Sequence, residues 1–285
     1  MASNPPSERS RSSFLSVPAP IRRLFDKFPL VTYPENALPA SRPNLHDHVL
    51  YVFGDGPVSF NPACLKWQAY LKFSQVPFRS VSSNNHASPS GALPFLLPVS
   101  ADSKLAKPIP SGRLQRWIMD KSSSAIEESP DGRYEAYLSL IDHRIRRAWL
   151  YSVYLSANST SIAEPLYILT SSRNSFVRLA IARELSHAAE KELLKFSAVI
   201  DSRSLYSQAE EAFDALETVL GKHTWFFGNE SPALFDASVF AYTHLLLDDR
   251  LGKGWMDTRL RDTLLKKKRL VAHRNKILEI YFQEA

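Results

Sequence analysis

Short apolar runs separated by polar turns characterise the chain beyond residue 45. HVLYVF (48–53) is a continuous apolar run, which is typical of a strand buried on both faces. The pattern predicts a second strand at 76–81 and a third within GALPFLLPV (91–99). Residues 107–110 suit a short edge strand. Together these runs predict a small sheet.

A helix is predicted between the first two strands. Asn61 can accept hydrogen bonds from free N–H groups at a helix start, and Pro62 suits the first helical position. Three apolar side chains then share one face: Cys64, Trp67 and Leu71. A second helix, SGRLQRWIMDK (111–121), follows the fourth strand. This order of elements is that of a thioredoxin-like domain, which we place at residues 46–121.

From Gly132 onward the pattern is helical. Apolar residues recur at spacings of three and four: Tyr134, Leu138, Ile141, Ile145 and Trp149. Further amphipathic helices are predicted at 176–196 and 205–220. Ala237–Leu247 contains no Asp, Glu, Lys or Arg, and a helix of this length belongs in the middle of a bundle rather than across a membrane. We therefore predict an all-helical domain at residues 131–285, which follows the α+β, thioredoxin-like domain.

The N-terminal segment differs from the rest in composition. Residues 1–45 are rich in Ser, Pro and Arg, and we expect a mobile or loosely docked arm there. Its serines and basic residues are weakly similar to a mitochondrial presequence, but Glu8, Asp26 and the many prolines argue against one. The apolar core of a secretory signal is missing.

The number of cysteines, the length of the apolar stretches and the motifs present indicate which classes of protein are excluded. Cys64 is the only cysteine, so no disulfide can form within the chain and a reducing compartment is favoured. No window reaches the roughly 18 to 20 apolar residues that a membrane-spanning helix needs. The sequence has neither metal-ligand spacing nor a Gly-rich phosphate loop, so we expect no metal and no cofactor.

Positive charge is concentrated near the C-terminus. Residues 250–276 hold ten Lys or Arg and two Asp, a balance of 10 − 2 = +8 in a chain whose total is +6. The core of this segment is Lys266, Lys267, Lys268 and Arg269. Two interpretations stay open: a solvated helical face, or a surface that docks on anionic lipid or an acidic partner. Nucleic acid is disfavoured because the segment lacks interleaved aromatic residues.

A thioredoxin-like domain followed by helices resembles the glutathione-transferase fold. That fold has a cis-proline where this chain has LPFL (93–96), so the resemblance implies that Pro94 is cis; the alternative is an ordinary trans proline. The core helix of that fold usually opens with a capping box. Here Asp236 is present, but Ala233 stands where the box needs a hydroxyl.

Three longer stretches resemble the metaxin family, one branch of this fold. They are NPACLKWQAYLKFSQVPF (61–78), GALPFLLP (91–98) and WFFGNESPALFDASVFAY (225–242). The stretch FPLVTYPENALP (28–39) is similar to the smaller fungal metaxin-type subunit of the mitochondrial sorting and assembly machinery (SAM complex). The resemblance extends over roughly residues 28–285.

The residues that a glutathione transferase needs are incomplete here. Tyr51 lies in the first strand between apolar neighbours, which favours a packed tyrosine over a catalytic one. Enzymes of this fold with a catalytic cysteine place it at the helix N-cap, where Asn61 stands, so Cys64 is interpreted as a packing residue. Pro110 stands where the glutathione site has an acidic residue before its serine. Ser111 matches that serine and is expected to cap its helix.

The resemblance implies a function without catalysis. Metaxins are peripheral proteins on the cytosolic face of the mitochondrial outer membrane. They act with a membrane-embedded β-barrel subunit and a second metaxin-like subunit. Their implied task is to receive β-barrel precursors, recognise their signal strand and help insert them. Two alternatives remain: a soluble glutathione transferase or thiol-handling enzyme, and an interaction domain of the type found in translation factors.

Overall fold

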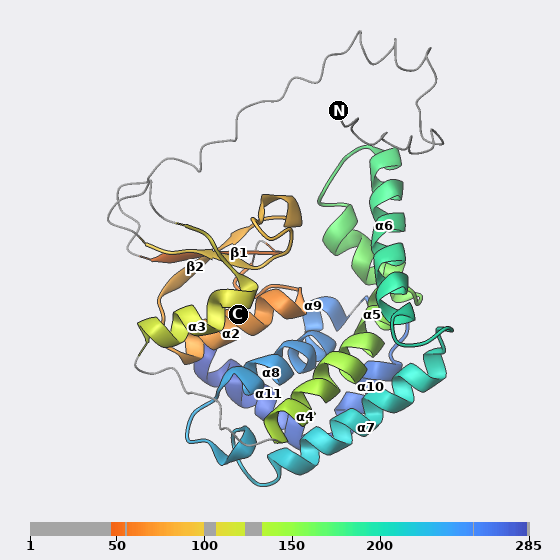
Figure 1. Cartoon of the computed structure of the whole chain (residues 1–285). Coiled ribbons are helices and arrows are strands. Elements are labelled where there is room, and N and C mark those ends of the chain that lie inside the picture. The colour runs from red at the N-terminus through yellow and green to blue at the C-terminus, as the bar shows by residue number, and fades with distance from the viewer. Residues whose placement is uncertain (1–46, 55, 100–106, 123–132, 253, 284–285) are drawn as a thin grey trace, which may run out of the picture. The chain divides into compact units, whose positions relative to one another are not determined.

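The computed structural model describes residues 47–54, 56–99, 107–122, 133–252 and 254–283 (Figure 1). The predicted arm at 1–45 lies outside these residues. All described residues belong to one compact unit, Pro43–Ala285.

A sheet of four strands forms the N-terminal part. Its strands are β1 (His48–Val52), β2 (Phe78–Ser82), β3 (Phe95–Leu97) and β4 (Ile109–Pro110), in the order β2-β1-β3-β4. β1 pairs parallel with β2 and antiparallel with β3, and Leu50 lies opposite Leu96. The topology predicted from the apolar runs is confirmed, although β3 and β4 are shorter than their apolar stretches.

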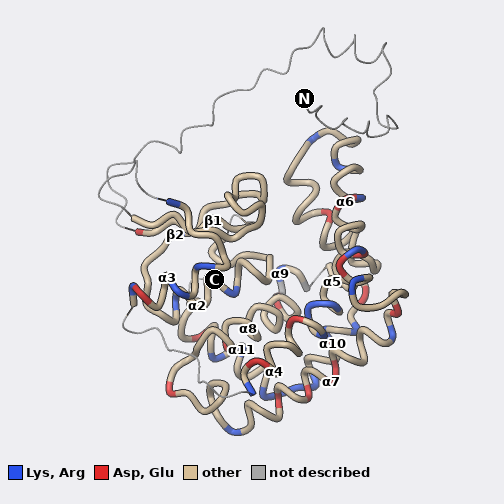
Figure 2. The backbone as a smooth tube through the Cα atoms, viewed as in Figure 1, with Lys and Arg blue, Asp and Glu red and all other residues tan. Residues whose placement is uncertain are grey.

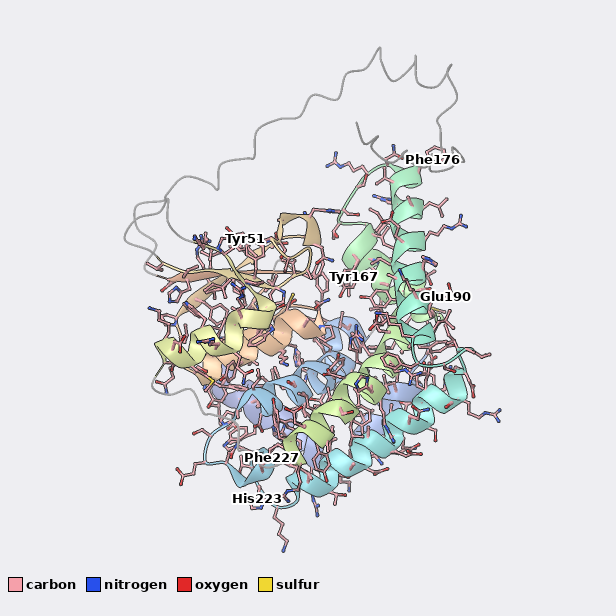
Figure 3. All side chains as sticks on the ribbon, in the orientation of Figure 1. Tyr51, Tyr167, Phe176, Glu190, His223 and Phe227 are labelled. Atoms are coloured by element: carbon pink, nitrogen blue, oxygen red, sulfur yellow. The ribbon has the colours of Figure 1, made fainter. Side chains whose placement is uncertain are left out.

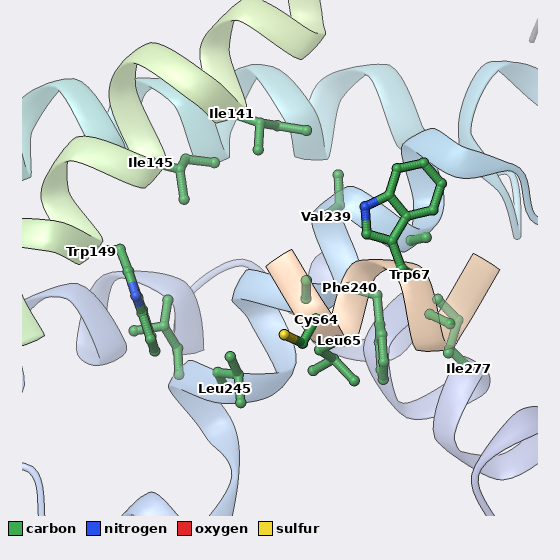
Figure 4. Packing of buried hydrophobic residues seen from close by; sticks show 14 of the residues in the cluster. Cys64, Leu65, Trp67, Ile141, Ile145, Trp149, Val239, Phe240, Leu245 and Ile277 are labelled. Carbon is green, nitrogen blue, oxygen red and sulfur yellow. The ribbon is translucent and has the colours of Figure 1, made fainter. Parts of the chain in front are cut away.

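Helix α2 (Pro62–Phe73) connects β1 to β2 and is buried on more than one side. The predicted face is buried, and so are Leu65, Tyr70 and Phe73 from other positions around the helix. The reason is that α2 has the sheet on one side and helix α8 (Leu234–Leu247) on the other. Figure 4 shows Cys64 and Leu65 of α2 opposite Phe240 and Leu245 of α8. The apolar contact between α2 and α8 joins the sheet to the helical part.

Helices form the rest of the described chain. In order these are η1 (Asn85–Ala87), α3 (Ser111–Lys121), α4 (Arg133–Leu140), η2 (Ile141–Ile145), α5 (Arg146–Tyr154), η3 (Ser159–Ile168), α6 (Ser175–Leu194), α7 (Ser202–Leu220), η4 (Phe226–Gly228), α8, α9 (Asp249–Gly252), α10 (Arg259–Leu265) and α11 (Lys268–Tyr281). The segments η2 and η3 have the wide turns of a π-helix. Pro165 lies inside η3, where its missing N–H interrupts a regular ladder.

The core helix of the bundle is α8, as predicted from the uncharged stretch 237–247. All of its residues except Tyr242 are buried. It packs against α2, α10 and α11. Within the described residues, we find no helix both long and apolar enough to span a membrane.

Candidate functional site

The start of α2 is the place where this fold keeps its redox or glutathione chemistry. Asn61 caps the helix: its Oδ1 accepts hydrogen bonds from the N–H groups of Ala63 (3.0 Å) and Cys64 (3.3 Å). These N–H groups carry the partial positive charge of the helix start, where an anionic thiolate would be stabilised. In this chain a side chain of the protein occupies them.

An aromatic cluster lies beside Asn61. Tyr167 of η3 packs edge-on against Phe53 (5.4 Å between ring centroids) and Phe60 (4.9 Å). Its hydroxyl oxygen accepts a hydrogen bond from Asn61 Nδ2 at 3.3 Å. Burial, followed by the neighbouring Tyr154, raises the pKa of Tyr167 well above its usual value, so it stays neutral. The helical part therefore contributes a tyrosine that packs at the start of α2.

Cys64 is a packing residue. Its side chain is fully buried, and burial raises the pKa of its thiol to about 12. A reactive cysteine requires the opposite, a lowered pKa and access to solvent. The interpretation of Cys64 as part of the core is therefore confirmed.

The Leu93–Pro94 peptide bond is cis, the isomer implied by the resemblance. In the glutathione-transferase fold this backbone edge faces the ligand, but here the Leu93 N–H donates to Asn85 Oδ1 at 3.0 Å. Tyr51 is partly buried and stacks on Phe95, with 4.5 Å between the ring centroids. It belongs to the strand packing, as predicted.

Ser111 does not cap its helix, so that prediction is wrong. Pro110 holds the cap position and Ser111 is the first helical residue, with no side-chain cap hydrogen bond. The physical reason is that the extended backbone of β4 continues through Pro110, so the helical turn begins one residue later than expected. Pro110, at the position where the glutathione site has an acidic residue, is thus the cap residue of α3.

The basic segment is less uniform than its sequence indicates. Lys267 is buried, and its Nζ lies 2.5 Å from Asp214 Oδ1 on α7. The backbone N–H of Arg269 donates to Glu217 of the same helix. Lys266 and Lys268 are exposed. Figure 2 shows acidic positions of α7 among the basic ones of α10 and α11. Lys267 is therefore paired within the fold, whereas Lys266, Lys268 and Arg269 are exposed, and the interpretation of the segment as a docking surface stays a prediction.

Asp236, which the sequence identified only as half of a capping box, has buried partners that the sequence did not reveal. Asp236 is fully buried, and its Oδ1 lies 2.8 Å from His273 Nε2 of α11 and accepts from the Phe226 N–H at 3.0 Å. Its Oδ2 accepts from the Ala233 N–H, which is the half capping box that Asp236 predicted. The partners Phe226 and His273 lie far from Asp236 in sequence, so no local pattern identifies them. This arrangement ties η4, α8 and α11 together and is structural.

Metal chemistry has no visible support in the part of the chain that the structure describes. Those residues include no group of three or more His, Cys, Asp or Glu placed to hold a metal ion.

The geometry described above defines a glutathione-transferase-like protein. Residues 62–160 match the family model described as the glutathione S-transferase N-terminal domain, and residues 209–277 match that of the C-terminal domain. Among solved structures, a glutathione S-transferase of Ceriporiopsis subvermispora in complex with glutathione has a TM-score of 0.53 at 14% identity. That alignment covers 83% of this chain and 98% of the transferase, and it supports the fold alone.

Sequence relatives show which branch of this fold the chain is similar to. Metaxin-1 of Mus musculus is 26% identical over 230 residues, which cover 75% of this chain and 68% of the mouse protein. Metaxin-1 of Macaca fascicularis is 27% identical over 224 residues, with the same shares of both chains covered. The chain is therefore similar to the metaxins among glutathione-transferase-like proteins.

Proposed function

We propose that this chain is a non-catalytic, peripheral protein of the mitochondrial outer membrane that helps to insert β-barrel proteins. The observation that carries the proposal is the start of α2 in a chain similar to the metaxins. Its helix N–H groups bind Asn61, its cysteine is buried, and Tyr167 packs beside it. A scaffold in this condition is suited to docking rather than to thiol chemistry.

A physical need for such a protein exists. A β-barrel precursor carries unpaired strand edges and an apolar outer face, and both promote aggregation until the barrel closes. A protein at the cytosolic face of the membrane can hold the terminal signal strand of the precursor close to the insertion site. We place this chain there as the smaller metaxin-type subunit of the sorting and assembly machinery.

Three partners follow from this role. They are the membrane-embedded β-barrel subunit of the machinery, a second metaxin-like subunit and the precursors themselves. The stretch that resembles the smaller fungal subunit, 28–39, lies outside the described residues, so this part of the proposal depends on sequence likeness. The exposed Lys266 and Lys268 remain available for an acidic partner or anionic lipid.

Import into isolated mitochondria tests the proposed role. A radiolabelled β-barrel precursor is imported into mitochondria depleted of this protein, and its assembled form is resolved by native electrophoresis. We expect several-fold slower assembly, restored when the protein is expressed again. A precursor that reaches the matrix serves as the control and should import normally. Unchanged β-barrel assembly would contradict the proposal.

A glutathione assay tests the absence of catalysis. We expect the purified chain to pass through immobilised glutathione and to show no conjugation of a model electrophile above the uncatalysed rate. Turnover lost in the Tyr51→Phe or Cys64→Ser variant would instead establish an enzyme.

A further inference from the structure

Apolar side chains are exposed where η3 turns into α6. The most exposed is Phe176, with a relative solvent exposure of 85%, followed by Leu179 at 69%. Leu169 and Val177 are also exposed, at 43% each. We refer to Leu169, Phe176, Val177 and Leu179 as the α6 tip. Exposed apolar groups of this size, gathered within eleven residues, form a candidate binding surface.

The α6 tip lies at the free end of a long helix. Helix α6 has 20 residues and packs against α5 and η3. Its two buried residues, Ala189 and Leu193, lie in its second half. Figure 1 shows the first half of α6 extending beyond the bundle, and Figure 3 shows Phe176 at its end. The core of the described chain therefore does not account for the apolar residues at the tip.

The outward face of α6 changes its composition along the helix. Phe176, Leu179 and Ala180 stand at positions i, i+3 and i+4 and share one face. One to three turns after Ala180, the exposed residues include Glu184, His187, Glu190 and Lys191. A merely solvated helix would carry such polar residues along its whole length. The apolar end is thus a local feature with a function of its own.

The charges around the α6 tip have one sign. Residues 169–183 contain Arg173, Arg178 and Arg183 and no Asp or Glu. Arg178 is held close to the turn, because its Nε donates to the Ser172 carbonyl at 2.6 Å. The nearest acidic residues are Glu164 on η3 and Glu184. An apolar tip whose own charged residues are all arginines is complementary to an apolar layer beneath negative charges.

Resting on the outer-membrane role proposed above, we propose that the α6 tip inserts into the headgroup region of a bilayer that carries anionic lipids. Phe176 and Leu179 enter the boundary between headgroups and acyl chains, and Arg173 and Arg183 bind the lipid phosphates. The apolar residues provide the insertion and the arginines provide the preference for anionic lipid. The combination gives reversible, peripheral attachment.

This site is distinct from the basic segment. In Figure 1 the first half of α6 lies at the upper end of the described elements, whereas α10 and α11 lie at the lower side. A flat membrane bound by the α6 tip is therefore remote from Lys266 and Lys268. The two surfaces can be tested against each other.

A fluorescent label at the tip provides a direct test. The Phe176→Cys variant of the full chain is labelled with an environment-sensitive dye, and Met256→Cys is the control because Met256 is 67% exposed and lies between α9 and α10. Cys64 does not interfere because it is fully buried with a pKa near 12. With vesicles of phosphatidylcholine and a fifth cardiolipin, we expect a blue shift at position 176 and none at position 256.

Vesicle co-sedimentation measures the contribution of each group. We expect Leu179→Asp to weaken binding more than tenfold, and the matched Met256→Asp to leave it unchanged. Arg173→Gln with Arg183→Gln should remove most of the preference for anionic vesicles, whereas Lys266→Gln with Lys268→Gln should retain it. Thermal unfolding of each variant verifies that the fold is intact.

Three results would overturn this inference. One is the absence of a blue shift at position 176. Another is loss of vesicle binding in the Lys266 and Lys268 variant but not in the tip variants. The third is a shift that occurs without vesicles and grows with protein concentration, which would identify a second copy of the chain as the occupant. Because protein-free vesicles contain no assembly partners, these outcomes are independent of the import assay.

Discussion

Single residues in this chain have environments that differ sharply from what their type alone indicates. Cys64 and Tyr167 carry groups that are often reactive, yet both are packed and both have raised pKa values. His244 is buried in α8 and stacks on Phe240, with 5.2 Å between the ring centroids. Burial removes water from all three, and burial penalises the charged form of each group.

Replacing Cys64 tests whether it is only a packing residue. We expect Cys64→Ala to lower the free energy of unfolding by about 1 kcal/mol, since a buried sulfur is lost, and to leave β-barrel assembly intact. In the native protein the thiol should react with a maleimide only as fast as the chain unfolds. Loss of assembly at an unchanged melting temperature would indicate a chemical role.

His244 should make the stability of the chain depend on pH. Burial, followed by the charge of Arg274, lowers its pKa from 6.5 to about 4, while Asp248 acts in the opposite direction. Between these two values the unfolded chain binds a proton that the folded chain does not. The contribution of His244 to stability is therefore present above pH 6.5 and is lost as the pH falls toward 4.

Urea unfolding at pH 7 and pH 5 measures this effect. We expect the wild-type protein to lose about 2 kcal/mol more than the His244→Leu variant between these two pH values. Equal losses in the two proteins would show that His244 takes up its proton as easily in the folded state as in the unfolded state.

At the scale of elements, the sequence predicted those features that depend on local patterns. The uncharged stretch 237–247 identified the buried helix α8, and Asn61 with Pro62 identified the start of α2. Contacts between distant elements could not be predicted in this way. Tyr167 lies 106 residues from Asn61, so nothing near either residue indicates that η3 covers the start of α2.

The basic segment illustrates the same limit of local patterns. Lys266 to Arg269 appear as four equivalent charges in the sequence, but the turn between α10 and α11 directs Lys267 toward Asp214 on α7. The acidic residues of α7 belong to a separate helical pattern some fifty residues earlier. Only the packing of α7 against α10 and α11 brings them together.

Charge reversal within this segment should therefore have unequal effects. We expect Lys267→Glu to destabilise the fold by about 1–3 kcal/mol, because it places a carboxylate beside Asp214. The matched double variant, Lys266→Glu with Lys268→Glu, should stay within about 0.5 kcal/mol of the wild type, since both side chains are exposed. Equal destabilisation by both variants, measured by urea unfolding, would show that Lys267 is no more important than its neighbours.

At the scale of the whole molecule, backbone N–H groups that bind ligand in enzymes of this fold are hydrogen-bonded to side chains of the protein itself. Asn61 binds the N–H groups at the start of α2, and Asn85 binds the Leu93 N–H beside the cis-proline. The remaining distinctive features lie on the surface, in the α6 tip and in the exposed lysines between α10 and α11. The proposed function assigns the contacts with membrane and partners to these surfaces.

Affinity purification from mitochondria solubilised in a mild detergent tests this account most directly. The tagged full chain is recovered and the proteins bound to it are identified by mass spectrometry. The account predicts that an outer-membrane β-barrel protein and a second metaxin-like protein co-purify in comparable amounts. Recovery of the chain without either partner, together with retention on immobilised glutathione, would contradict it.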